Sequence, residues 1–183
     1  MSAIPTHTWM SIAEFDSLPD VDDREYELHE GELVEVTFPI WIHGKLQERV
    51  RALLQAAIGA AGLVHVEMPF QISTAARQTK RRADVAFVPH DRARQVLDAG
   101  TLEGAPALIV EVLSPSNTAS KLNRDARLFL ANGAEEFWMV DYDNKTIRVR
   151  GKDRIEREYE SGESIPLRFG AGAIAVSEVF QDL

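Results

Sequence analysis

The sequence predicts a mixed α/β domain in which a central β-sheet is flanked by helices. Two strand-like runs, Ala83–Val88 and Ala107–Leu113, are almost wholly apolar, which is typical of strands in the middle of a sheet covered on both faces. Apolar residues also recur at helical spacing over about residues 42–61 and 118–132. Long helices beside buried strands indicate layers of helix and sheet packed together.

The remaining elements follow from shorter patterns. Ser11 and Glu14 have the spacing of a capping box and predict a first helix that ends near Pro19. Gly62 and Gly133 stand where the two long helices should end. Alternating runs on either side of short turns predict hairpins. In chain order we expect a hairpin at 26–29 and 33–36, strands at 63–67, 70–73, 83–88 and 107–113, a loop over 74–82, a short helix at 93–99, a hairpin at 137–141 and 146–150, and two or three short strands at the end.

The composition fits one compact domain spanning residues 1–183. The chain has 183 residues, 45% of them hydrophobic, and no cysteine, which excludes disulfides and cysteine-bound zinc or iron–sulfur sites. No apolar run approaches the ~20 residues of a membrane-spanning helix, and residues 1–10 lack the pattern of a secretion signal. We therefore expect a cytoplasmic protein without a membrane partner.

The charge limits how a nucleic acid could be bound. The net charge of −9 argues against broad electrostatic binding, because that affinity comes largely from lysines and arginines that displace counterions. Basic residues are concentrated in Lys80, Arg81 and Arg82, immediately before Asp84. These three residues are candidates for contacts with a nucleic acid, and a solvated loop explains them equally well.

Two acidic residues interrupt the two apolar strands. Glu111 lies in the middle of one run, and Asp84 is the second residue of the other. Burying an ionised carboxylate costs on the order of several kcal/mol unless a cation compensates it. Two carboxylates on neighbouring strands form an oxygen-rich site, which suits a hard divalent ion such as Mg²⁺. A strand-end or salt-bridged residue is the ordinary explanation for either acid taken alone.

The segments around these acids resemble the Uma family of restriction-endonuclease-like proteins, which has the PD-(D/E)xK nuclease fold. The resemblance is carried by Arg82–Val85 and Ala105–Ser116. Three further segments agree in order: Glu27–Leu33 is similar to the family's opening hairpin, His43 to the histidine that opens its long helix, and Gly133–Asp141 to its Gly-x-x-Glu-Tyr-Trp-x-Val-Asp strand. The resemblance covers nearly the whole chain.

The resemblance implies a divalent-metal-dependent endodeoxyribonuclease that hydrolyses phosphodiester bonds in DNA. It implies Mg²⁺ or Mn²⁺ as cofactor, with Asp84 and Glu111 as metal ligands and the main-chain carbonyl of Val112 as a further ligand. Such a metal polarises the scissile phosphodiester and lowers the pKa of a bound water. We also expect a homodimer, because symmetric pairing is the usual form of soluble oligomers.

The catalytic lysine departs from the superfamily pattern, because Leu113 stands two residues after Glu111 where a lysine is usual. The resemblance implies a lysine on the following helix, four residues after an acid, but here Lys121 and Asp125 stand in the reverse order. Residues four apart share a helix face. We therefore expect Lys121 to be the catalytic lysine and activity to survive an exchange of the two residues. A solvent-exposed ion pair explains them about as well.

Four further residues are candidates for contacts with the substrate or with the metal ligands. Glu27 lies in the first predicted hairpin, His43 near the start of the long helix and Gln71 on the strand before Asp84. Asp125 is the fourth candidate, because it lies beside the apolar face of its helix. The ordinary explanations are a solvated acid for Glu27, a surface or capping histidine for His43, and pairing along a strand edge for Gln71.

Two alternatives come from other functional classes. The first is a catalytically inactive nuclease-fold module that binds nucleic acid or a protein partner, which the reversed lysine and acid and the acidic net charge favour. The second is phosphoesterase chemistry on a small nucleotide, for which no base-recognition loop is evident. The sequence contains no phosphate-binding glycine loop, nucleophile elbow or HExxH pattern, so nucleotide kinases, serine hydrolases and zinc proteases have no support.

Overall fold

The structure, a computed structural model, describes residues 9–19, 24–36, 41–114 and 117–183. No helix in these described ranges is both long and apolar enough to cross a membrane. In chain order the elements are α1 (Ile12–Asp16), β1 (Glu25–His29), β2 (Glu32–Val36), α2 (Trp41–Ile58), the 3₁₀ turn η1 (Gly59–Ala61), β3 (Gly62–Ser73), β4 (Gln78–Pro89), α3 (His90–Ala99), β5 (Leu102–Glu103), β6 (Leu108–Val112), α4 (Ala119–Ala131), β7 (Glu136–Asp141), β8 (Thr146–Gly151), β9 (Glu156–Tyr159), β10 (Ser164–Pro166), β11 (Ala173–Ala175) and α5 (Val176–Val179).

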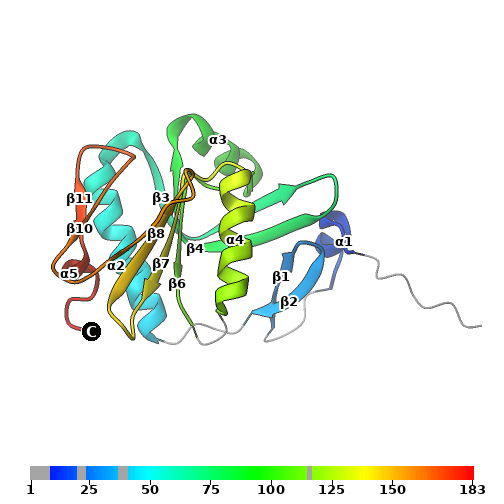
Figure 1. Ribbon diagram of the computed structural model, residues 1–183. Helices are drawn as coiled ribbons and strands as arrows, with labels where there is room; N and C mark the ends of the chain where they lie inside the picture. Colours follow the sequence, from blue (N-terminus) through cyan, green and yellow to red (C-terminus); the bar gives the residue numbers. More distant parts are fainter. Residues whose placement is uncertain (1–8, 20–23, 37–40, 115–116) are drawn as a thin grey trace, which may run out of the picture.

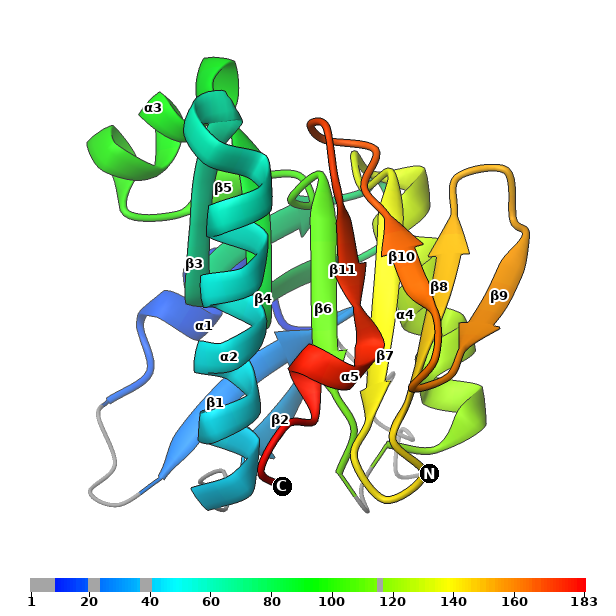
Figure 2. The same ribbon diagram turned by 90° about the vertical axis from the view of Figure 1, so that its left-hand side faces the viewer.

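A mixed sheet forms the centre of the molecule. Its strand order is β2-β1-β4-β6-β7-β8-β9, with β3 paired to β4 and β5 paired to β3. The strand predicted at residues 107–113 is β6, which lies between antiparallel β4 and parallel β7. Helix α2 covers one face of the sheet and α4 lies on the other (Figures 1 and 2). The predicted fold class, a central mixed sheet flanked by helices, is therefore confirmed.

Each face of the sheet carries its own apolar layer. On one face, α2 packs through residues such as Leu46 and Leu54 over Val110 and Trp138. On the other face, Phe129 of α4 packs edge-on against Phe70 and Phe137, with ring centroids 5.4 and 5.7 Å apart. Because β6 contributes to both layers, its apolar residues leave no solvated face. This explains why its sequence is a nearly continuous apolar run.

Local turn chemistry follows the sequence closely. The Ser11–Glu14 capping box is present in both directions. Glu30 and Gly31 both have positive φ, 49° and 87°, as a type I′ turn between β1 and β2 requires. Gly133 follows α4 with a φ of +123°. Pro115 and Ser116, which separate the predicted strand at 107–113 from the helix predicted over about 118–132, lie outside the described residues.

Two predicted boundaries are wrong. Strands β3 and β4 form one long hairpin joined by residues 74–77 only, so residues 80–82 lie in a strand and not in a loop. That half of β4 pairs with β1 instead of β6. Because its outward-facing side chains are polar, the sequence pattern there is typical of a loop and does not indicate a strand. Gly62 does not end α2, because Gly59 leaves the helix with a φ of +62°. Gly62 begins β3 instead.

At Glu67 and Asp84, the regular alternation of side chains between the two faces of the β3–β4 hairpin is interrupted. The register is continuous on either side, yet these two residues are missing from the ladder, and Glu67 has a φ of +49°. Side chains two apart normally share a face, but Ala83 and Ala86 both pack in the α4 layer, with Val85 in the α2 layer between them. Asp84 therefore lies at a local reversal of the strand.

The two halves of β4 also have different neighbours. Val85–Phe87 pairs with β6, whereas Lys80 pairs with Leu28 of β1. Strand β4 therefore leaves β6 near Asp84 and passes to the first hairpin, which lies to one side of the main sheet in Figure 1. The end of β6 is left without a β4 partner at this point. The two acids of interest lie at this divergence.

Gly62→Ala is expected to lower the free energy of unfolding by about 1–3 kcal/mol, as overpacked sites do. A Cβ at this position would lie 2.2 Å from the carbonyl oxygen of Val88 and 2.6 Å from Cε2 of Phe87. Gly44→Ala is the matched control, because a Cβ there meets nothing within 4 Å and a helical alanine should stabilise by about 0.5–1 kcal/mol. Urea titrations measure both variants. Equal stability of the Gly62 variant and the wild type would contradict the close approach of β3 to β4.

Candidate functional site

Asp84 is held between α2 and the end of β6. Its Oδ2 accepts a hydrogen bond from the main-chain N–H of Val112 at 2.7 Å and lies 3.2 Å from Nε2 of His43. Its Oδ1 accepts a hydrogen bond from Nε2 of Gln47 at 3.0 Å. His43 and Gln47 are one turn apart on α2 and therefore project from the same side of the helix. The carboxylate is thus fixed by three donors from two elements.

The environment of His43 favours its charged form. Burial alone lowers the pKa of His43, but the hydrogen bond to Asp84 and the negative charges of Asp84 and Glu67 outweigh it and leave this pKa raised. Nδ1 of His43 is buried and has no hydrogen-bond partner among the described residues. The structure therefore places the histidine singled out in the sequence against one of the two expected metal ligands.

Gln47 and Glu67 extend the site, and the sequence analysis missed both. Nε2 of Gln47 lies 2.5 Å from Oε1 of Glu67, so one amide bridges Glu67 and Asp84. Burial raises the pKa of Glu67, the hydrogen bond from Gln47 lowers it, and the charge of Asp84 raises it again, to a value above the ordinary one. An amide on the apolar face of a predicted helix, one turn after His43, was the available signal.

Glu111 carries a buried oxygen without a partner. Val85 pairs with Val110 in the β4–β6 ladder, so the same register continued by one residue places Asp84 opposite Glu111. Oε1 of Glu111 is buried and accepts no hydrogen bond from the described residues. Burial raises the pKa of Glu111 well above its ordinary value, and the charge of Asp84 adds to this, while the charge of Arg81 opposes it. Such a carboxyl is either protonated or compensated by a cation.

These two acids fit a magnesium-type centre that water and substrate would complete. In the described part of the chain, no three His, Asp or Glu side chains are gathered so that they could hold a metal by themselves. Mg²⁺ usually binds through one or two carboxylates and keeps several waters or phosphate oxygens as further ligands. Asp84 and Glu111 are two carboxylates of this kind, and the buried oxygen of Glu111 has no partner among the described residues. The ligand role expected for the carbonyl of Val112 stays a prediction, and the N–H of the same residue donates to Asp84.

Arg81 is buried, although we expected it on a nucleic-acid-binding surface. Only 5% of the residue is exposed. Its Nη1 lies 2.9 Å from Oδ2 of Asp125, its Nε lies 3.4 Å from Oε2 of Glu27, and its guanidinium is 5.2 Å from the ring centre of Phe129. Burial lowers the pKa of Arg81, but the charges of Asp125, Glu111 and Glu27 more than reverse this. The placement of Arg81 therefore corrects the expected role.

Lys80 and Arg82 flank Arg81 on the outer side of β4. Nζ of Lys80 lies 2.7 Å from Oδ1 of Asp16, and Nη1 of Arg82 lies 2.7 Å from Oε2 of Glu25. Both side chains reach solvent, as alternation along a strand requires when the residue between them is buried. Their expected contact with a nucleic acid stays a prediction, and a phosphate would have to compete with these two acids.

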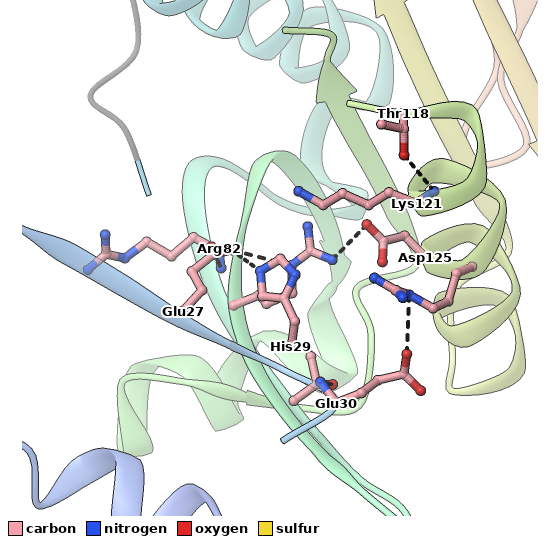
Figure 3. Close-up of polar contacts among 10 residues, drawn as sticks. Glu27, His29, Glu30, Arg82, Thr118, Lys121 and Asp125 are labelled. Atoms are coloured by element: carbon pink, nitrogen blue, oxygen red, sulfur yellow. Dashed lines mark hydrogen bonds and ion pairs between the residues drawn. The ribbon is translucent and has the colours of Figure 1, made fainter. Parts of the chain in front are cut away.

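Glu27 enters the site from β1. Its Oε2 lies 2.7 Å from Nε2 of His29, and its Oε1 accepts a hydrogen bond from the N–H of Arg82 at 2.8 Å (Figure 3). Burial raises the pKa of Glu27, but the hydrogen bond to His29 and the charge of Arg81 outweigh this and leave the pKa lowered. Burial lowers the pKa of His29, assisted by the charges of Arg81 and Lys121. His29 is a further site residue that the sequence analysis missed.

Lys121 and Asp125 lie four residues apart on α4 but do not pair with each other. Asp125 is only 6% exposed and pairs with Arg81, so the alternative of a solvent-exposed pair is wrong for this residue. Lys121 forms no ion pair within the described part of the chain, and its charge lowers the pKa of His29. In Figure 3 no dashed line joins the side chains of Lys121 and Asp125.

Gln71 lies outside this group of residues. It pairs with Lys80 in the β3–β4 ladder, and its side-chain amide donates a hydrogen bond to Glu103 on β5. Its position therefore does not support the expected contact with the substrate or the metal ligands. The structure brings together the other residues singled out in the sequence analysis, apart from the solvent-facing Lys80 and Arg82.

Comparisons with known proteins agree with this architecture. The crystal structure of a putative nuclease belonging to DUF820 from Anabaena variabilis ATCC 29413 matches with a TM-score of 0.80 over 93% of this chain and 97% of that chain, at 18% identity. This likeness shows the shared fold. Residues 12–176 match the model of the Uma2 family, described as "Putative restriction endonuclease". The chain therefore belongs to the Uma2 family, as the sequence motifs predicted. No curated protein matches it.

Glu27→Gln is expected to lower the free energy of unfolding near neutral pH by about 1–3 kcal/mol, because the charged hydrogen-bond partner of His29 and of the Arg82 N–H, which also pairs with Arg81, is lost. The pKa of Glu27 is lowered from 4.5, so its contribution is fully present above about pH 4.5 and is lost as the pH falls through the lowered pKa. Urea titrations of both proteins at several pH values should show the difference narrowing in acid. Glu25→Gln, an exposed change on the same strand, should have a smaller effect. A difference independent of pH would contradict an ionised Glu27.

Proposed function

We propose that this protein is a Mg²⁺- or Mn²⁺-dependent endonuclease that hydrolyses phosphodiester bonds in DNA. The observation that carries the proposal is the buried, unpartnered oxygen of Glu111 opposite Asp84. A buried carboxylate without a cation is costly, and a divalent ion would remove that cost while gaining two oxygen ligands. Membership of the Uma2 family, described as "Putative restriction endonuclease", supports the reaction class.

Each residue of the site has a physical role in this proposal. Asp84 and Glu111 would hold the ion, which when bound polarises the phosphodiester and lowers the pKa of a water. Gln47 and His43 orient the Asp84 carboxylate through their contacts with its two oxygens. Lys121, which no acid neutralises among the described residues, would stabilise the charge that develops on the phosphate.

The two long helices favour an anionic substrate at this place. His43, in the first turn of α2, contacts Asp84, and the start of α4 is capped by Thr118, whose hydroxyl accepts a hydrogen bond from the N–H of Lys121. The positive ends of both helix dipoles are therefore near the site. With a net charge of −9, binding to DNA should depend on these local features and weaken with salt. The expected homodimer stays a prediction.

A catalytically inactive module is the second candidate function. The observation in its favour is that three donors already occupy the carboxylate of Asp84, so a metal has to displace at least one of them. In an inactive module these contacts would be permanent. The protein would then bind nucleic acid or a protein partner without hydrolysis.

Purified protein is expected to cut plasmid and single-stranded DNA with Mg²⁺ or Mn²⁺ and to lose this activity with a chelator. Asp84→Asn and Glu111→Gln should each lower the rate by about 100-fold or more, the scale of losing a group that stabilises transition-state charge. Glu135→Gln is the matched control, since it removes the same charge from an exposed position. Equal cutting by all four proteins would indicate a contaminant and favour the inactive module.

Glu111→Gln is expected to stabilise the metal-free protein by about 1–2 kcal/mol, because it replaces a buried acid that repels Asp84 with a neutral side chain. Asp84→Asn should destabilise it, because the charged acceptor of three donors is lost. Thermal unfolding with chelator measures both effects. Adding Mn²⁺ should raise the Tm of the wild type only, since an ion that binds the folded state stabilises it. A Glu111 variant that is less stable than the wild type without metal would count against the proposal.

A further inference from the structure

We propose that Arg81 is a positioning residue that keeps Asp125 away from Lys121 and so leaves the Lys121 ammonium free to face the site. The arrangement of the ion pairs does not depend on the proposed function. The catalytic consequence does depend on it, because it assumes that Lys121 acts on the substrate. The two parts can therefore be tested separately.

The local sequence alone would pair Lys121 with Asp125. The two residues are four apart on α4, where side chains of opposite charge are neighbours and normally attract. The structure shows a different pairing, in which Oδ2 of Asp125 lies 2.9 Å from Nη1 of Arg81. Lys121 takes part in no ion pair within the described ranges, and its charge acts on His29 instead. A cation on another strand has therefore replaced the local partner.

Burial explains why Arg81 is the stronger partner. The side chains of Arg81 and Asp125 are 5% and 8% exposed, so water and salt screen their attraction much less than that of a surface pair. The guanidinium is also held by Glu27 on β1 and by the ring of Phe129. A planar group already held by two other contacts loses little further freedom when it binds a carboxylate.

The position of Arg81 links this pairing to the metal ligands. Arg81 lies three residues before Asp84 on β4, and its charge acts on Glu111. Its contacts with Glu27 and Asp125 tie β1 and α4 to the strand that carries Asp84. The acid of α4 must therefore stand at position 125, opposite Arg81, and the free lysine stands one turn earlier.

This inference reverses one expectation from the sequence. We expected activity to survive an exchange of Lys121 and Asp125. The exchange would place an ammonium beside the buried guanidinium of Arg81, and like charges in such a site repel strongly. The exchanged protein should therefore lose stability and activity together.

The test measures the reactivity of the Lys121 amine toward an acylating reagent by mass spectrometry, with the exposed Lys152 as internal reference. In Arg81→Met, Asp125 loses its partner and should capture Lys121. A pKa rise of about one unit would lower labelling of Lys121 about tenfold. In the double variant Arg81→Met/Asp125→Asn, no acid remains at position 125, and labelling should return to within about threefold of the wild type. DNA cleavage should fall in Arg81→Met and recover in the double variant.

Several outcomes would overturn the inference. One is unchanged labelling of Lys121 in folded Arg81→Met, and another is a double variant that is folded but labelled as weakly as the single one. If Arg81→Met does not fold, the single variant Asp125→Asn tests the inference instead. Labelling of Lys121 should then stay at the wild-type level. A rise in labelling would show that Asp125 already pairs with Lys121 in the wild type. If the wild type cuts no DNA, the proposed function fails, while the labelling results still decide the ion-pair arrangement.

Discussion

The parting of β4 from β6 at Asp84 is the constraint on which the candidate site depends. While two strands are paired, each main-chain N–H at their junction has a carbonyl partner, and a buried N–H without one is costly. Where β4 leaves, the Asp84 carboxylate accepts the N–H of Val112 at 2.7 Å. The same hydrogen bond thus completes the end of β6 and fixes the acid. The positive φ of Glu67, opposite Asp84, indicates that local strain accompanies this reversal.

Around the divergence of β4 and β6, the carboxylates near Arg81 outnumber its single positive charge. The buried guanidinium of Arg81 is shared by Asp125, Glu27 and the nearby Glu111. In a weakly polar interior one cation cannot offset three carboxylates, and Glu111 is the acid left with an unpartnered oxygen. A divalent ion between Glu111 and Asp84 would supply the missing positive charge. Arg81 therefore both links β1 and α4 to β4 and partly offsets the charge of Glu111.

Local patterns in the sequence predict those features whose causes are local. The apolar run of β6 and the glycine turn after His29 follow from neighbouring residues, and the acids that interrupt apolar strands stand out for the same reason. The strand at residues 78–82 could not be predicted, because its pairing with Leu28 is a long-range contact. The burial of Arg81 depends on its ion pair with Asp125, which lies on a helix that is distant in the sequence. Gln47 stands on the apolar face of the predicted helix, but its neighbours in the sequence do not show that its amide contacts Glu67 and Asp84, which lie on separate strands.

The two candidate functions differ in how they account for Glu111. An inactive module gains nothing from an acid whose burial and nearby charges raise its pKa so far, because an apolar or amide side chain of similar size would fill the same space at lower cost. In the proposed nuclease that acid would have a use, since its unpartnered oxygen would be available to bind a metal ion. Residues that lower the stability of the folded protein are characteristic of binding and catalytic sites. The energetic cost of Glu111 is therefore a physical argument for the enzyme.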